Sequence, residues 1–97
     1  MAKTKLKTTR YGSAKYLKSK KDIAAYLDAA LEDGDPRLIR HALNVIARAR
    51  GMTQIARDSG VTRESLYRAL AENGNPEFTT VLKVVHALGL RLRTRPA

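Results

Sequence analysis

The chain has 97 residues, enough for one compact domain. Because it has only four Tyr, one Phe and no Trp, the core must be built from Leu, Ile, Val and Ala, a composition that favours packed helices. It has no cysteine for disulfides or thiolate chemistry, no apolar run of the ~20 residues that a membrane span needs, and no secretory signal, so we expect a cytoplasmic protein without a membrane partner. The formal net charge of +10 favours a polyanionic partner, most commonly nucleic acid.

Residues 1–18 are expected to form a basic N-terminal arm. Eight Lys and Arg residues and no acid lie between Met1 and Lys21, and the first part offers almost nothing to bury. This composition predicts a disordered segment at least as far as Thr9, whereas Leu17 could attach the later part to the domain. An arm that contacts DNA and a tail that is merely solvated are equally good interpretations.

An acidic amphipathic helix is predicted over residues 19–34. Ser19 is a suitable N-cap with Asp22 three residues on, and Gly34 is a suitable C-terminal cap. The segment from Asp22 to Pro36 carries five acids and no cation. The apolar residues have helical spacing and should form one stripe facing the core: Ile23, Tyr26, Leu27, Ala30 and Leu31.

A second helix should begin with Asp35 as N-cap and Pro36 at the first helical position, and should end at Gly51. Its apolar residues cover a wide arc, which predicts a central place in the core: Leu38, Ile39, Ala42, Leu43, Val45, Ile46 and Ala49. On its polar face we expect Arg37, His41, Asn44 and Arg48.

The stretch from Thr53 to Leu70 has the pattern of a helix-turn-helix. Such a motif needs a small residue where the second helix crosses the first, a residue that tolerates positive φ in the turn, and apolar residues on the buried side of the second helix. Ala56 and Gly60 meet the first two needs. The third is met by Val61, Leu66 and Ala69 or Leu70.

The second helix of this motif is expected to begin after Thr62, whose hydroxyl should accept a hydrogen bond from the amide near Ser65. A tyrosine between charged residues on a short exposed helix has no evident packing role, which favours a DNA-binding face over a merely solvated one. With Leu66 and Leu70 buried, the side chains that should project from the domain are Arg63, Glu64, Tyr67 and Arg68.

These projecting side chains suit different DNA contacts. A recognition helix inserts its N-terminal part into the major groove, so Arg63 and Glu64 are predicted to read base edges. Arginine pairs with guanine and glutamate accepts from cytosine, each worth ~1–3 kcal/mol of discrimination. Tyr67 could touch a thymine methyl group or a phosphate, and Arg68 is better placed for phosphate.

After a loop that cannot continue a helix, Glu72–Pro76, a last helix is predicted from Thr79 or Thr80 to Leu88. The alternation over Leu90–Arg93 could form a short strand against a partner or an ordered extension, and residues 94–97 form a tail. By position, the last helix and Leu90–Arg93 are candidates for dimerisation. The residues of the last helix expected to face the core are Val81, Leu82, Val85 and Leu88, with Gly89 as the cap.

From Asp35 to Leu92 the chain resembles the Cro/repressor-like (XRE) helix-turn-helix domains, and residues 35–93 are expected to form that domain. The resemblance lies in Arg50–Gln54, Ser59–Arg63, Gly74–Pro76 and Val81–Gly89. The chain is more closely similar to the addiction module antidote proteins, antitoxins similar to HigA. The features that carry this similarity are Arg63–Tyr67, Gly74–Pro76 and a preceding helix like Ile23–Leu31.

This resemblance implies an all-α, five-helix Cro/repressor-like domain that serves as a type II antitoxin. Such a protein binds and neutralises a RelE/ParE-like (HigB-type) toxin, and represses its own operon by binding double-stranded operator DNA as a homodimer. The XRE pattern also makes Gln54 a phosphate contact, although Thr53 precedes Ala56 by three residues where XRE domains usually show five. The predicted DNA-binding residues are Gln54, Thr62, Arg63, Glu64, Ser65, Tyr67 and Arg68.

The acidic helix is the part of the chain least suited to touching DNA. A basic toxin would be attracted to Asp28, Glu32 and Asp33, which are the predicted toxin-binding residues. The alternative is an amphipathic helix that packs on the core and keeps its acids in water.

Enzymatic activity is not expected. His41 and His86 lie on separate predicted helices without a His, Cys or carboxylate at ligand spacing, and there is no phosphate-binding loop or nucleophile motif. No catalytic residue, metal or cofactor is therefore predicted. The open alternatives are a free-standing Cro-like repressor without a toxin partner and a protein-interaction module, whereas an RNA-binding protein would need stacking aromatics that are lacking.

Overall fold

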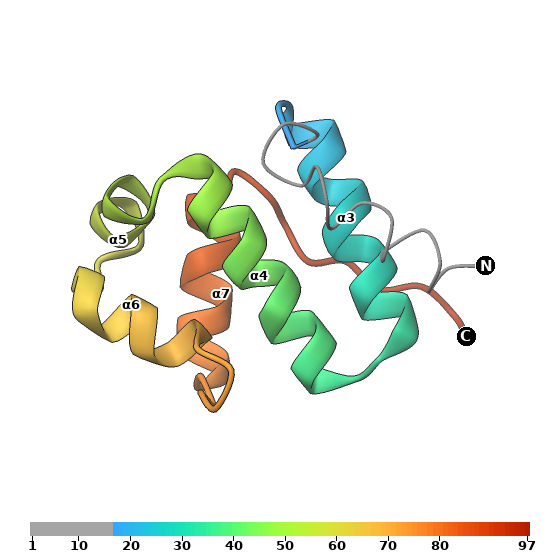
Figure 1. Cartoon of the computed structure of the whole chain (residues 1–97). Coiled ribbons are helices and arrows are strands. Elements are labelled where there is room, and N and C mark those ends of the chain that lie inside the picture. The colour runs from blue at the N-terminus through green and yellow to red at the C-terminus, as the bar shows by residue number, and fades with distance from the viewer. Residues whose placement is uncertain (1–16) are drawn as a thin grey trace.

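The computed structural model describes residues 17–97, which form five helices and, within that range, no strand (Figure 1). α4 lies in the middle, with α3 packed on one side of it and α5 and α6 on the other, while α7 packs against α5. The all-helical prediction is confirmed for these residues, and the predicted N-terminal arm lies outside them as far as residue 16. The helices are α3 (Lys20–Asp33), α4 (Pro36–Arg50), α5 (Met52–Ser59), α6 (Arg63–Leu70) and α7 (Phe78–Ala87).

The ends of α3 and α4 lie where their capping residues predict. The Ser19 hydroxyl accepts from the amide of Asp22 at 3.1 Å, and Gly34 closes α3 in the left-handed conformation with φ of 85°. Asp35 caps α4 by accepting from the backbone amide of Arg37 at 2.9 Å, and this hydrogen bond lowers the pKa of the Asp35 carboxyl below its ordinary value.

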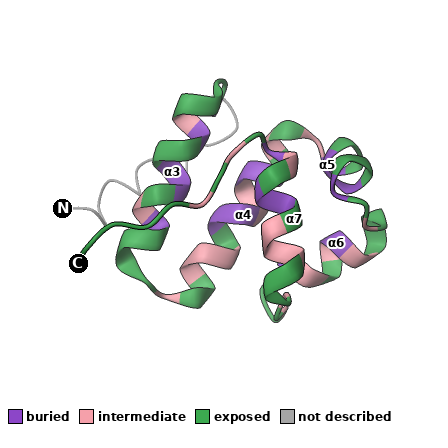
Figure 2. Cartoon of the chain, turned by 180° about the vertical axis from the view of Figure 1, so that it is seen from behind, coloured by how far each residue is buried: buried purple, intermediate pink, exposed green. Residues whose placement is uncertain are grey.

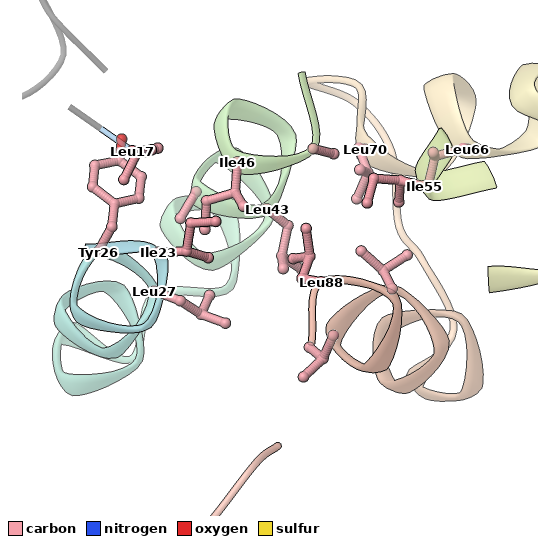
Figure 3. Close-up of a cluster of buried hydrophobic side chains, with 14 of the residues drawn as sticks. Leu17, Ile23, Tyr26, Leu27, Leu43, Ile46, Ile55, Leu66, Leu70 and Leu88 are labelled. Carbon is pink, nitrogen blue, oxygen red and sulfur yellow. The ribbon is translucent and has the colours of Figure 1, made fainter. Parts of the chain in front are cut away.

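The core is continuous through the domain and centres on α4 (Figure 3). Leu43 and Ile46 are almost fully buried, with the apolar stripe of α3 on one side and the residues of α5 to α7 on the other. Figure 2 shows that buried positions lie on the helix faces turned toward one another. Leu17 is also buried and lies beside Tyr26, as expected for the end of the arm.

Two details of the predicted core are wrong. Leu31 remains 40% exposed, because it lies at the edge of the α3 stripe beside residues 90–93 rather than against α4. α7 begins at Phe78, slightly earlier than predicted. Val85 and Leu88 are buried and Val81 packs half-buried against the core, as predicted, but Leu82 is only half-buried and Val84, which was not predicted, is buried.

Residues 90–97 form an extended segment that returns alongside α3 (Figures 1 and 2). Leu90 and Leu92 pack against the core, and Arg95 forms an ion pair with Glu32 at 3.6 Å. Within this single chain, residues 90–93 thus form the ordered extension that was one of the two predictions for them. Among the described residues, none of the helices has the length and apolar character needed to cross a membrane.

Candidate nucleic-acid interface

α5 and α6 are joined by a three-residue turn, residues 60–62, with the predicted conformation. Gly60 has φ of 78°, a left-handed conformation that a side chain would strain, and its amide donates to the carbonyl of Ala56 at 3.0 Å. Thr62 is extended, and its hydroxyl accepts from the amide of Ser65 at 3.0 Å. Because both sides of the turn are capped, the direction of α6 relative to α5 is fixed.

The rest of the domain holds α6 along its inner side and at its C-terminal end. Leu66 and Leu70 are buried in the core. The side-chain amide of Asn44, on α4, donates to the carbonyl of Leu70 at 2.7 Å, which satisfies one of the open carbonyls at the helix end. Arg40, also on α4, donates to the carbonyl of Gly74 at 3.3 Å and so fixes the following loop.

The outer face of α6 carries the predicted DNA-binding side chains. Arg63, Glu64 and Arg68 are exposed, whereas Ser65 and Tyr67 are half-buried. The expectation that this tyrosine has no packing role is wrong. The guanidinium carbon of Arg63 lies 5.2 Å from the centre of the Tyr67 ring, and its Nη2 donates to the tyrosine hydroxyl at 3.2 Å.

A second arginine, Arg48 of α4, lies at the same distance of 5.2 Å from the Tyr67 ring. From the sequence it was expected only on the polar face of α4, and nothing in the spacing indicates that this face meets α6. The tertiary packing of α4 on α6 is what brings it to the candidate surface.

The cations near α6 have no acidic partners. All nine Asp and Glu residues of the chain belong to the part that the structure describes, and only two ion pairs occur there, Asp35 with Arg37 and Glu32 with Arg95. Uncompensated positive charge on one side of a domain attracts polyanions. The arginines on or beside α6 that are exposed and outside those pairs are Arg48, Arg63 and Arg68.

Gln54 is not brought together with the residues of α6. Its side-chain amide donates to Asp58 one turn along α5, at 2.9 Å. Both residues line a hollow of about 370 Å³ that is shared with the residues before α3, the end of α4 and the end of α7, and no α6 residue lines it.

The predicted toxin-binding residues lie on α3, on the opposite side of α4 from α6 (Figure 1). Asp28, Glu32 and Asp33 are exposed. Glu32 makes the ion pair with Arg95, and Asp28 borders a hollow of about 360 Å³ between α3 and residues 90–93. The surface therefore carries charges of both signs. No group of three His, Cys, Asp or Glu side chains within residues 17–97 is arranged to hold a metal ion.

Comparison with known proteins identifies the family. A family model described as "Probable addiction module antidote protein" matches residues 7–96 of the chain. A protein of Haemophilus influenzae strain Rd, described as uncharacterized, is 49% identical over 82 residues, which are 84% of each chain. No solved structure matches. Because the family match covers nearly the whole chain, this protein belongs to the family of probable addiction module antidote proteins, a membership that implies a toxin–antitoxin role and a toxin partner.

Proposed function

We propose that this antidote protein is an HigA-like antitoxin that binds and neutralises a RelE/ParE-like toxin, and that it represses its own operon as a homodimer on operator DNA. The DNA-binding part of the proposal rests on one observation. The outer face of α6 presents arginines without carboxylate partners, on a short N-capped helix whose inner face and C-terminal end are fixed to the domain. A rigid cationic helix of this kind fits the major groove.

The position of each side chain on α6 suggests its contact. Arg63 and Glu64 lie in the first turn and are proposed to read base edges. Arg68 lies in the last turn and is proposed to bind a phosphate. Thr62 and Ser65 lie at the start of the helix, where they would approach the DNA backbone, and Gln54 is retained as a phosphate contact on the strength of the family resemblance alone.

The exposed side chain of Phe78 supports a homodimer. It begins α7 and is 69% exposed, so that it is accessible to a second protomer. Leu90 and Leu92 of the other predicted dimerisation segment pack against the core of their own protomer instead. A two-fold interface that includes the start of α7 is therefore preferred to one built on residues 90–93.

Replacing Arg63 by alanine is expected to reduce the preference for operator over random DNA by about 5- to 150-fold, which corresponds to the loss of one arginine–guanine contact of ~1–3 kcal/mol. Arg63 is exposed and the fold does not depend on its side chain. The measurement is the ratio of the two dissociation constants at one salt concentration. An unchanged ratio would remove Arg63 from the residues that read bases.

Replacing Arg68 by alanine should give the contrasting result. Affinity for operator and random DNA should fall alike, and the slope of log affinity against log salt should flatten by about 0.9, the contribution of one phosphate contact. Arg37→Ala is the matched control, because Arg37 is an exposed helical arginine that already pairs with Asp35. If Arg68→Ala changes selectivity instead of the salt slope, the assignment to phosphate is wrong.

The toxin-binding part of the proposal rests on family membership and on the location of α3. Since α3 and α6 lie on opposite sides of α4, one chain could hold the toxin and the operator at the same time. A basic ribonuclease-like toxin would be attracted to the exposed acids of α3. Co-expression with the product of the neighbouring gene, followed by co-purification and growth rescue, would separate an antitoxin from a free-standing repressor.

Replacing Asp28, Glu32 and Asp33 together by lysine is expected to weaken capture of the toxin by at least tenfold, because three attractive charges become repulsive. Operator binding should persist, since these side chains lie away from α6. A matched control replaces Glu72 and Glu77, exposed acids outside α3, by lysine. Toxin capture that is equally strong in the triple variant and the control would show that the toxin binds elsewhere.

A further inference from the structure

We infer that Tyr67 is a positioning residue for two arginines, Arg63 of its own helix and Arg48 of α4, and that Arg48 binds a DNA phosphate. The inference rests on the proposed DNA binding and adds to it a contact from outside α5 and α6. It also gives Tyr67 a different role, because the tyrosine acts through the arginines rather than through its own contact with DNA.

The two arginines converge on one aromatic ring. Each guanidinium carbon lies 5.2 Å from the centre of the Tyr67 ring, within the range in which the ring face attracts a cation. Arg63 also donates to the tyrosine hydroxyl at 3.2 Å. Tyr67 is half-buried, so the ring itself is held against the domain while both arginines remain exposed.

Arg48 is oriented from a second direction. Its Nε donates to the side-chain oxygen of Asn44 at 2.7 Å, and the amide of Asn44 donates to the carbonyl of Leu70 at 2.7 Å. One chain of contacts thus links Arg48 to both the middle and the end of α6. With Nε engaged, the terminal Nη groups are left to meet the paired oxygens of a phosphate.

The charges of this arrangement favour a bound anion. Two guanidinium groups beside the same ring repel each other, and no carboxylate lies within 4.0 Å of either one. The chain segment that the structure does not describe cannot supply one, because residues 1–21 contain no acid. A phosphate near the pair would relieve this repulsion.

The positions of the two arginines suggest different contacts with DNA. Arg63 is the first residue of α6 and would enter the groove with it. Arg48 belongs to α4 and would stay beside α6. A residue beside the recognition helix meets the sugar–phosphate backbone at the groove edge rather than the bases. The ring would therefore hold one arginine toward a base and the other toward a phosphate.

The test compares Arg48→Ala, Tyr67→Phe and Tyr67→Leu, with Arg37→Ala as control, by titrating operator and random DNA over a range of salt concentrations. Arg48→Ala should weaken both DNAs about fivefold at ~0.15 M salt and flatten the salt slope by about 0.9. Tyr67→Phe keeps the ring and should keep the wild-type slope. Tyr67→Leu removes the ring, so it should flatten the slope and also lower the preference for operator.

Several outcomes would overturn the inference. An unchanged slope for Arg48→Ala would show that this arginine does not bind phosphate, and Tyr67→Leu with wild-type slope and selectivity would show that the ring positions neither arginine. Melting temperature and toxin capture serve as folding controls for Tyr67→Leu. If that variant does not fold, Arg48→Ala still tests the phosphate contact, because Arg48 is exposed. Absence of operator binding by the wild-type protein would instead overturn the proposed function and this inference together.

Discussion

Replacing Leu66 by alanine is expected to lower the free energy of unfolding by about 2–5 kcal/mol. Leu66 is 0% exposed and lies with Ile55 and Leu70 in the core between α6 and its neighbours (Figure 3). Truncation removes apolar contacts and leaves a cavity that capped, rigid helices cannot close. Since a domain of this size is stable by only about 5–15 kcal/mol, much of its stability would be lost.

The effect of Leu66→Ala is measured by denaturant or thermal unfolding, in which 1 kcal/mol shifts the melting temperature of a domain this small by ~4–8 °C. Leu66→Met conserves volume and should cost less than about 1.5 kcal/mol. Phe78→Ala, at a side chain that is 69% exposed, should change the free energy of unfolding by no more than about 0.5 kcal/mol in the monomer. If Leu66→Ala cost no more than Phe78→Ala, the described packing of α6 would be wrong.

Replacing Gly74 by alanine should destabilise the domain by about 1–3 kcal/mol or more, although it adds only one methyl group. The loop passes so close to the end of α6 that a Cβ at Gly74 would overlap the carbonyl oxygen of Ala69 and lie 2.6 Å from that of Arg68. Both are backbone atoms, so the loop or the helix end must move. The hydrogen bond from Arg40 to Gly74 would be strained as well.

Thermal unfolding again provides the measurement for Gly74→Ala, and operator affinity provides a second one because the displaced loop adjoins α6. The matched control is Asn73→Ala, in the same loop but at an exposed position, which should be close to neutral. Equal stability of the two variants would contradict the close approach of the loop to α6.

The central position of α4 connects the two proposed surfaces. It packs against the acidic helix α3 on one side and against α5 and α6 on the other. It also supplies the side chains that hold α6 and the loop after it, namely Asn44 and Arg40. A substitution in α4 can therefore affect DNA binding without any contact to DNA, which is why stability must be measured beside affinity for each variant.

The amino-acid sequence by itself determined where α3, α4 and α6 begin and where α3 and α5 end. Ser19, Asp35 and Thr62 cap helices as predicted, because a short polar side chain can satisfy an open backbone amide without any distant partner. Gly34 and Gly60 end helices in the left-handed conformation for a reason equally local, the absence of a Cβ. The buried positions of α6 also followed from helical spacing, since Leu66 and Leu70 share one face.

Only the tertiary structure decided which elements meet. That Arg48 approaches Tyr67, that Leu31 stays exposed, and that the C-terminal segment lies along α3 with Arg95 at Glu32 all depend on residues far apart in the chain. Residue spacing within one helix predicts the direction in which a side chain points around the helix axis. It does not predict which other element that side chain will contact. The crossing of α4 and α6 turned a polar residue of one helix into part of the candidate surface of another, because contacts between helices depend on packing across the whole core.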